Sequence, residues 1–203
     1  LSCVGDQQNN TTLILDWLDN YSVSDNCDSE PTVSHNFVTC TEAAPPGSHL
    51  EIWELTGQPG NQASNSANSS SAGIGAGTLS RGTGLTAAAL GGAIGASGWF
   101  SSTTPTTLAD AIANDDYFEF TLPVLAGYQA NVTQITLIAH SSGSGPNTAT
   151  LRSSADGFTS NLGTISLTTT SGVKNIPLNM SNLSGTVTFR LYGYGSGAGG
   201  GNP

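Results

Sequence analysis

From residue 117 to residue 195 the chain alternates apolar and polar positions in short runs, the pattern of half-buried β-strands. The runs recur at intervals of roughly ten residues, and turn-forming clusters such as "SSGSGPN" and "ADGF" separate them. They are "YFEFTLPV", "NVTQITLIAH", "NTATLRSS", "LGTISLTTT", "KNIPLNMS" and "GTVTFRLYGYG". Short, regularly punctuated strands predict an all-β fold, here an antiparallel β-sandwich of the jelly-roll type.

The pattern weakens before residue 117. Residues 50–57, "LEIWELTG", carry apolar side chains on both alternating faces and predict a strand. Residues 57–98 are rich in Gly, Ala, Ser and Asn and contain one charge, Arg81. We expect an ordered, loop-rich segment there, with short strands around "GTLSRGTG". Residues 107–115, "TLADAIAND", predict one or two helical turns that cap the sandwich.

The N-terminal segment has a different character. Residues 11–19, "TTLILDWLD", have the spacing of a short helix, and Val33, His35 and Phe37 alternate as in a strand. The run "TEAAPPGSH" then interrupts regular structure. Nine of the fourteen carboxylates lie in residues 1–54, which hold no Lys or Arg. The sequence therefore predicts an acidic fragment with its linker at 1–48 and a β-sandwich domain at 49–203.

Composition narrows the function classes. Charged residues make up 9% of the chain and the formal net charge is −10, so a phosphate backbone is an unfavourable partner and no nucleic-acid partner is expected. The longest apolar run, "AAALGGAIGA", is far shorter than the ~20 residues of a membrane span, so none is expected. A surface of hydroxyls and amides favours an extracellular or cell-surface location.

Three cysteines lie in the acidic segment. One disulfide and a third thiol are the simplest arrangement for a secreted module, and the pairing is left open. The disulfide candidates are Cys3, Cys27 and Cys40.

No motif points to catalysis. The chain lacks a G-x-S-x-G element, and His35, His49 and His140 lie in three separate segments. Cysteine and histidine positions also lack the tight ligand pairs of structural zinc sites. We therefore expect a non-catalytic protein without a firmly implied cofactor.

Two acidic clusters are candidates for calcium, because Ca²⁺ takes several oxygen ligands. Asp and Asn in turns also satisfy backbone amides, and that alternative stays open for both clusters. The calcium candidates are Asp25, Asp28, Glu30, Asp115 and Asp116. A further alternative is saccharide binding, because aromatic side chains stack on sugar rings as readily as they pack in a core. The aromatic candidates are Trp53, Trp99, Tyr117, Tyr128, Tyr192 and Tyr194.

The N-terminal stretch "LSCVGDQQNNTTLILDWLDNYSVSDNCDSEPTVSHNF" resembles the first part of HYR-type, immunoglobulin-like repeats of large bacterial surface proteins. The resemblance lies in a Cys near the first strand, the "W-L" helix and the "SDNC" turn. It implies a small immunoglobulin-like fragment that contains a short helix.

Residues 50–195 resemble a jelly-roll-like sandwich domain of large exported bacterial proteins, adhesin-like or type IX-secreted. The motifs are "GTLSRGTGL", "DDYFEFTL", "SGPNTATLRSSADGFTS" and "VTFRLYGYG". The resemblance implies one further strand after "FRLYG", which this sequence lacks, so an unpaired sheet edge is expected. Arg81, Arg152 and Arg190 fall within the resembling stretches, and we expect them to be structural clamps on carbonyls or on carboxylates such as Glu119 and Asp156.

These observations predict a structural or adhesive segment of a bacterial extracellular or cell-surface protein, used for surface display, adhesion or filament building. Its expected partners are other domains or subunits of an assembly, joined by strand addition, or glycans. The alternative is a carbohydrate-binding accessory module of a secreted hydrolase.

Overall fold

The computed structural model of the protein describes residues 49–99 and 107–196. They belong to one unit of the chain, which begins at His49. The predicted fragment of residues 1–48 lies outside the described residues, and with it lie the three cysteines and the calcium candidates Asp25, Asp28 and Glu30.

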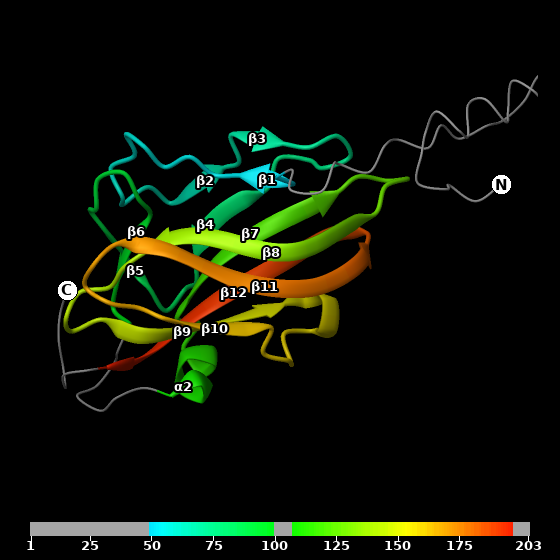
Figure 1. Ribbon diagram of the computed structural model, residues 1–203. Coiled ribbons are helices and arrows are strands. Elements are labelled where there is room, and N and C mark those ends of the chain that lie inside the picture. The colour runs from blue at the N-terminus through cyan, green and yellow to red at the C-terminus, as the bar shows by residue number, and fades with distance from the viewer. Residues whose placement is uncertain (1–48, 100–106, 197–203) are drawn as a thin grey trace, which may run out of the picture. The chain divides into compact units, whose positions relative to one another are not determined.

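A six-stranded antiparallel sheet forms one layer of the domain (Figure 1). Its strands, in spatial order, are β10 (Gly163–Ser166), β9 (Pro146–Ser153), β12 (Gly185–Ser196), β7 (Tyr117–Val124), β4 (Thr78–Arg81) and β2 (Ser64–Ser66). The two long central strands, β12 and β7, pair from Gly185↔Val124 to Tyr192↔Tyr117.

The second layer contains the antiparallel ribbon of β8 (Ala130–Ala139) and β11 (Gly172–Leu183). Ala130, Val132 and Ile176 of the ribbon share one hydrophobic core with Leu151 and Phe189 of the sheet. The ribbon and the sheet therefore bury a common apolar interior, as Figure 1 shows. The all-β, antiparallel sandwich predicted from the sequence is confirmed.

Side chains of β12 alternate strictly between the two faces of the six-stranded sheet. Val187, Phe189 and Leu191 face the ribbon and are buried in the core. Arg190 and Tyr192 face the other way. We call the face toward the ribbon the inner face and the opposite one the outer face.

Two small sheets complete the described strands: β1 (Glu51–Ile52) pairs with β3 (Ser69–Ser70), and β5 (Thr86–Ala88) pairs with β6 (Gly95–Ser97). The predicted strand at 50–57 is thus confined to Glu51–Ile52. A turn follows, in which the Gln58 N–H donates to the Leu55 carbonyl at 3.0 Å. Because that turn closes over Thr56 and Gly57, the remaining residues cannot continue the strand.

The helix α2 (Leu108–Ala113) covers part of the outer face. Thr107 caps it, since its side chain accepts from the Asp110 N–H while the Asp110 carboxylate accepts from the Thr107 N–H. Ala111 packs with Tyr117 and Tyr192 in a second, smaller apolar cluster. The helix is the short cap predicted from the sequence. Among the described residues, no helix is long and apolar enough to cross a membrane.

Candidate functional site

The inner face of the six-stranded sheet is unevenly covered. Under the ribbon, Leu151 is 0% exposed and Phe189 is 2% exposed. On the neighbouring strands β7 and β4, the inner-facing side chains of Phe118, Phe120 and Leu79 are only partly buried. We call Leu79, Phe118 and Phe120 the open half of the inner face, and the part beneath the ribbon, centred on Leu151 and Phe189, the covered half.

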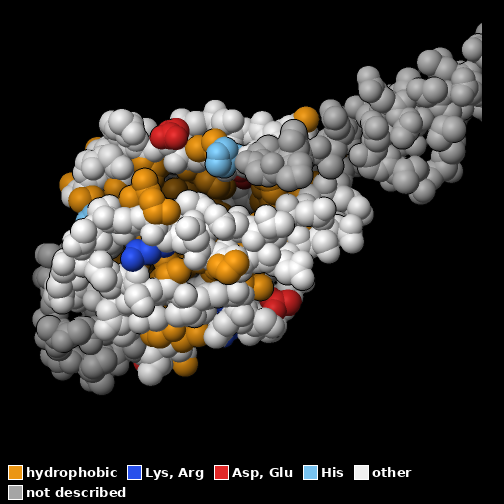
Figure 2. Space-filling model, in the orientation of Figure 1, with side chains coloured by type: hydrophobic (Ala, Val, Ile, Leu, Met, Phe, Trp, Pro, Cys, Tyr) orange, Lys and Arg blue, Asp and Glu red, His pale blue; other side chains and the backbone are white. Residues whose placement is uncertain are grey.

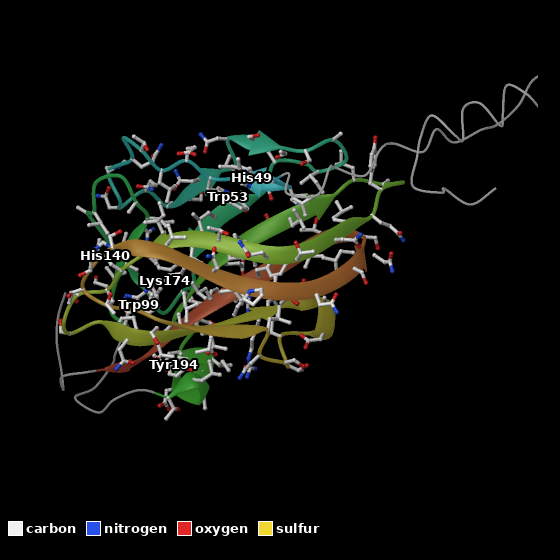
Figure 3. All side chains as sticks on the ribbon, viewed as in Figure 1. His49, Trp53, Trp99, His140, Lys174 and Tyr194 are labelled. Atoms are coloured by element: carbon white, nitrogen blue, oxygen red, sulfur yellow. The ribbon has the colours of Figure 1, made fainter. Side chains whose placement is uncertain are left out.

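Two tryptophans stand on the open half. Trp53 contacts Phe120 edge to face, with ring centroids 5.8 Å apart, and Trp99 contacts Phe118 in the same way at 5.5 Å. Figure 3 shows that they come from separate parts of the chain, Trp53 just after β1 and Trp99 just after β6. Phe120 also stacks on Phe189 at 5.3 Å, so the open half and the core are continuous.

The absence of a side chain at Gly193 allows Trp99 to approach the backbone of β12 closely. A Cβ placed on Gly193 would lie 2.5 Å from the Trp99 ring, closer than real Cβ atoms approach their neighbours. The Trp99 indole N–H donates to the Ala96 carbonyl at 3.2 Å, which fixes the ring. The glycine-rich end of β12 is therefore part of the site.

In the described part of the chain, the ribbon has one free strand edge on the side of the open half, because β11 packs beside β10 and the outer edge of β8 faces away from it. Among the described residues β8 pairs only with β11. Figure 2 shows hydrophobic side chains at the surface between the region of His49 and the ribbon. An apolar, aromatic surface therefore lies beside a free strand edge.

On the side of the open half away from the ribbon, polar contacts rather than apolar burial connect the neighbouring loops to β4. Arg81, on the inner face of β4, donates from Nε to the Gly95 carbonyl at 2.6 Å, from Nη1 to Gln62 at 2.7 Å and from Nη2 to Gly60 at 2.5 Å. One guanidinium thereby joins two loop segments to β4. Burial lowers the pKa of Arg81 below its usual value.

Glu51 makes a second polar contact there. One carboxylate oxygen, Oε1, accepts from the Gly77 N–H. The other, Oε2, is buried without a hydrogen-bond partner among the described residues, as is the indole nitrogen of Trp53. Burial raises the pKa of Glu51, against the opposing effects of the Gly77 N–H and the nearby Ser70 side chain.

On the outer face Arg190 lies between two aromatic rings. Its guanidinium carbon is 4.4 Å from the centroid of Tyr117 and 4.3 Å from that of Phe158, and Nε donates to Glu119 Oε2 at 2.7 Å. This combines cation–π contact with an ion pair. Arg190 is a clamp on a carboxylate.

Arg152 lies opposite Arg190 on the neighbouring strand and holds the β9–β10 loop. It donates to the Phe158 carbonyl at 2.8 Å and to Asn161 Oδ1 at 2.9 Å. Phe158 has φ 60°, a conformation rare for an aromatic residue, and this contact helps to hold it. Asp156 instead accepts from the N–H groups of Thr159 and Ser160 within the same loop.

The calcium candidates Asp115 and Asp116 lie in the turn that enters β7. Asp115 Oδ2 accepts from the Thr83 hydroxyl at 3.0 Å. Asp116 is 2% exposed, and burial raises its pKa to about 6, against the lowering effect of a hydrogen bond from Asn114. Within residues 49–99 and 107–196 no group of three or more His, Cys, Asp or Glu side chains is placed to hold a metal.

The structure sorts the predicted aromatic candidates. Tyr117 and Tyr192 are buried beneath α2, and the Tyr194 hydroxyl lies 2.9 Å from the Thr150 hydroxyl on the outer face. Trp53 and Trp99 are the two that stand on the open half. Sequence reasoning missed Phe118 and Phe120, and the signal was present: "YFEFTLPV" has aromatic residues at both parities, so both faces of β7 carry them.

The described residues define an all-β sandwich with a half-covered core and an aromatic surface beside a free edge. No protein-family model matches the chain, and comparison with curated proteins and with solved structures gives no significant match either.

Proposed function

We propose that this protein is a non-catalytic structural or adhesive segment of an extracellular or cell-surface protein, and that the open half is its contact surface. The observation that carries the proposal is the partial exposure of Phe118 and Phe120 on a central strand of the sheet. Central strands of a complete sandwich are covered on the inner face, and apolar surface left open in this way is typical of an interaction site.

The rest of the domain suits a display role. Outer-face groups are joined by local contacts such as the Arg190–Glu119 ion pair, which stabilise the scaffold itself. The resemblance of residues 50–195 to sandwich domains of exported bacterial proteins supports the same role and an extracellular location. Residues 49–203 hold seven carboxylates against four basic side chains, a formal net charge of −3, so the sandwich domain repels neighbouring copies of itself only weakly.

Adhesion of coated beads tests this function. Beads that carry the wild-type chain should cluster with one another or adhere to protein-coated surfaces. The Leu79→Asp variant, which places a charge on the open half, should lose this adhesion. The matched control is Val173→Asp, because Val173 is 62% exposed on the side of the ribbon that faces solvent. Wild-type beads that stay dispersed on every surface would contradict the function.

A carbohydrate-binding accessory module is the second candidate, favoured by the partly exposed indoles of Trp53 and Trp99. Indole rings supply flat apolar faces for sugar stacking. A glycan array probed with and without chelator separates the two functions, because saccharide-specific signals that vanish in Trp53→Ala and Trp99→Ala support the second one. Silence across the array would remove it.

A further inference from the structure

We propose that the open half accepts one extended strand of another polypeptide, which pairs with the free edge of β8 and lays apolar side chains on Leu79, Phe118 and Phe120. This inference rests on the proposed contact function and names the partner's chemistry: a lone strand with apolar side chains at every second position.

The two edges of the ribbon are protected differently. Natural sheets guard exposed edges with prolines, charges and bulges. β11 has Pro177, which lacks an N–H, and its pairing with β8 shifts register between Pro177 and Met180 and again before Leu183. β8 is ten residues long and contains neither a proline nor a charged residue. Because β11 packs beside β10, the unguarded edge of β8 is the one on the side of β7 and β4, which carry the open half.

The floor beside that edge matches a single strand. Every second side chain of an added strand would point toward the six-stranded sheet, where it would meet the half-buried rings of Phe118 and Phe120. Trp53 stands against Phe120, Trp99 stands against Phe118, and Glu51 contacts Gly77 at the entry to β4, so these groups bound the surface away from the ribbon. Because both sides are bounded, a lone strand fits better than the edge of another intact sheet.

Saccharide is a weaker occupant of this surface. Sugar sites need convergent polar groups that reach the ligand, whereas Leu79, Phe118 and Phe120 have none. The nearest unpartnered polar atoms, Glu51 Oε2 and Trp53 Nε1, are fully buried and do not face solvent. Main-chain pairing, by contrast, needs only a free edge and an apolar floor.

The test uses a fluorescein-labelled peptide, Lys-Val-Thr-Val-Thr-Val-Thr-Val-Lys, titrated with the intact chain. We expect saturable binding that Leu79→Asp weakens roughly 10- to 100-fold and that Val173→Asp leaves unchanged. Hydrogen exchange should slow at alternate amides of β8 when the peptide binds, because only every second N–H points toward the added strand.

Two N-methylated peptides make the test specific. With valines on the floor, either the valine or the threonine N–H groups face β8, depending on strand direction. Methylation of one set should abolish binding, and methylation of the other set should preserve it. Equal binding of both peptides, or none by the parent peptide, would overturn strand addition. If wild-type beads still adhered and Leu79→Asp beads did not, the proposed contact function would stand although strand addition had failed. If wild-type beads did not adhere either, both the contact function and strand addition would be refuted.

Discussion

The two halves of the inner face belong to one sheet and are stabilised in different ways. The covered half is closed by apolar side chains such as Leu151 and Phe189, with the ribbon above them. The open half is flanked by polar contacts, the three carbonyls held by Arg81 and the amide held by Glu51. The difference shows that this sandwich keeps an incomplete core by tying its loops with hydrogen bonds.

Removal of a phenylalanine from each half should give the largest contrast. Phe189→Ala leaves a cavity in the covered half and should lower the free energy of unfolding by about 3–5 kcal/mol. Phe118→Ala removes a ring that solvent already reaches and should cost about 1–2 kcal/mol. Urea denaturation followed by far-ultraviolet circular dichroism measures both. Equal losses would show that the halves are equally packed.

Arg81→Met should have the next largest effect, because it removes the guanidinium bonds to the carbonyls of Gly60, Gln62 and Gly95, although Gly60 still accepts from the Gly95 N–H. We expect a loss of about 2–3 kcal/mol, with faster amide exchange at Gly92 and Gly95, which lie in the segments that Arg81 holds. Arg152→Met is the control, since it removes contacts from the outer face and should leave those two amides protected. Unchanged exchange in Arg81→Met would refute the polar tie.

The free energy of unfolding should depend on pH through Asp116, in the turn that enters β7. The folded-state pKa of Asp116 is raised to about 6 from the ordinary 3.8, so the neutral carboxyl stabilises the fold. Its contribution is complete below about pH 4 and is lost as pH rises through 6, with a decrease on the order of 2 kcal/mol. Asp116→Asn should flatten this part of the profile of melting temperature against pH. A wild-type profile without this decline would contradict the burial effect.

Glu119→Gln should have the smallest effect. The ion pair with Arg190 is partly exposed, and such pairs contribute about 1 kcal/mol or less. Arg190 also retains its contacts with Tyr117 and Phe158. A larger loss, measured in urea at low and high salt, would mean that charge on the outer face contributes to stability on the same scale as the packing of the open half.

Alternation along "YFEFTLPV" and "GTVTFRLYGYG" was enough to predict β7 and β12, because successive side chains of a strand point to opposite faces and the pattern is visible within each segment. It was not enough for the open half. Whether a strand lies above Phe118 depends on contacts between segments far apart in sequence. The alternation of side chains along one strand does not predict how many strands the second layer contains. The contacts of Arg81 with residues 60, 62 and 95 have the same origin.

The placement of Trp53 and Trp99 gives the domain a built-in optical asymmetry. Both described indoles contact rings of the open half, and within residues 49–99 and 107–196 the covered half has none. Excitation near the red edge of protein absorbance therefore illuminates one side of the sheet selectively. In a Trp17→Phe variant, which removes the tryptophan outside the described residues, emission wavelength and quenching by small solutes would follow that side alone. An event at the surface then becomes visible without any added dye.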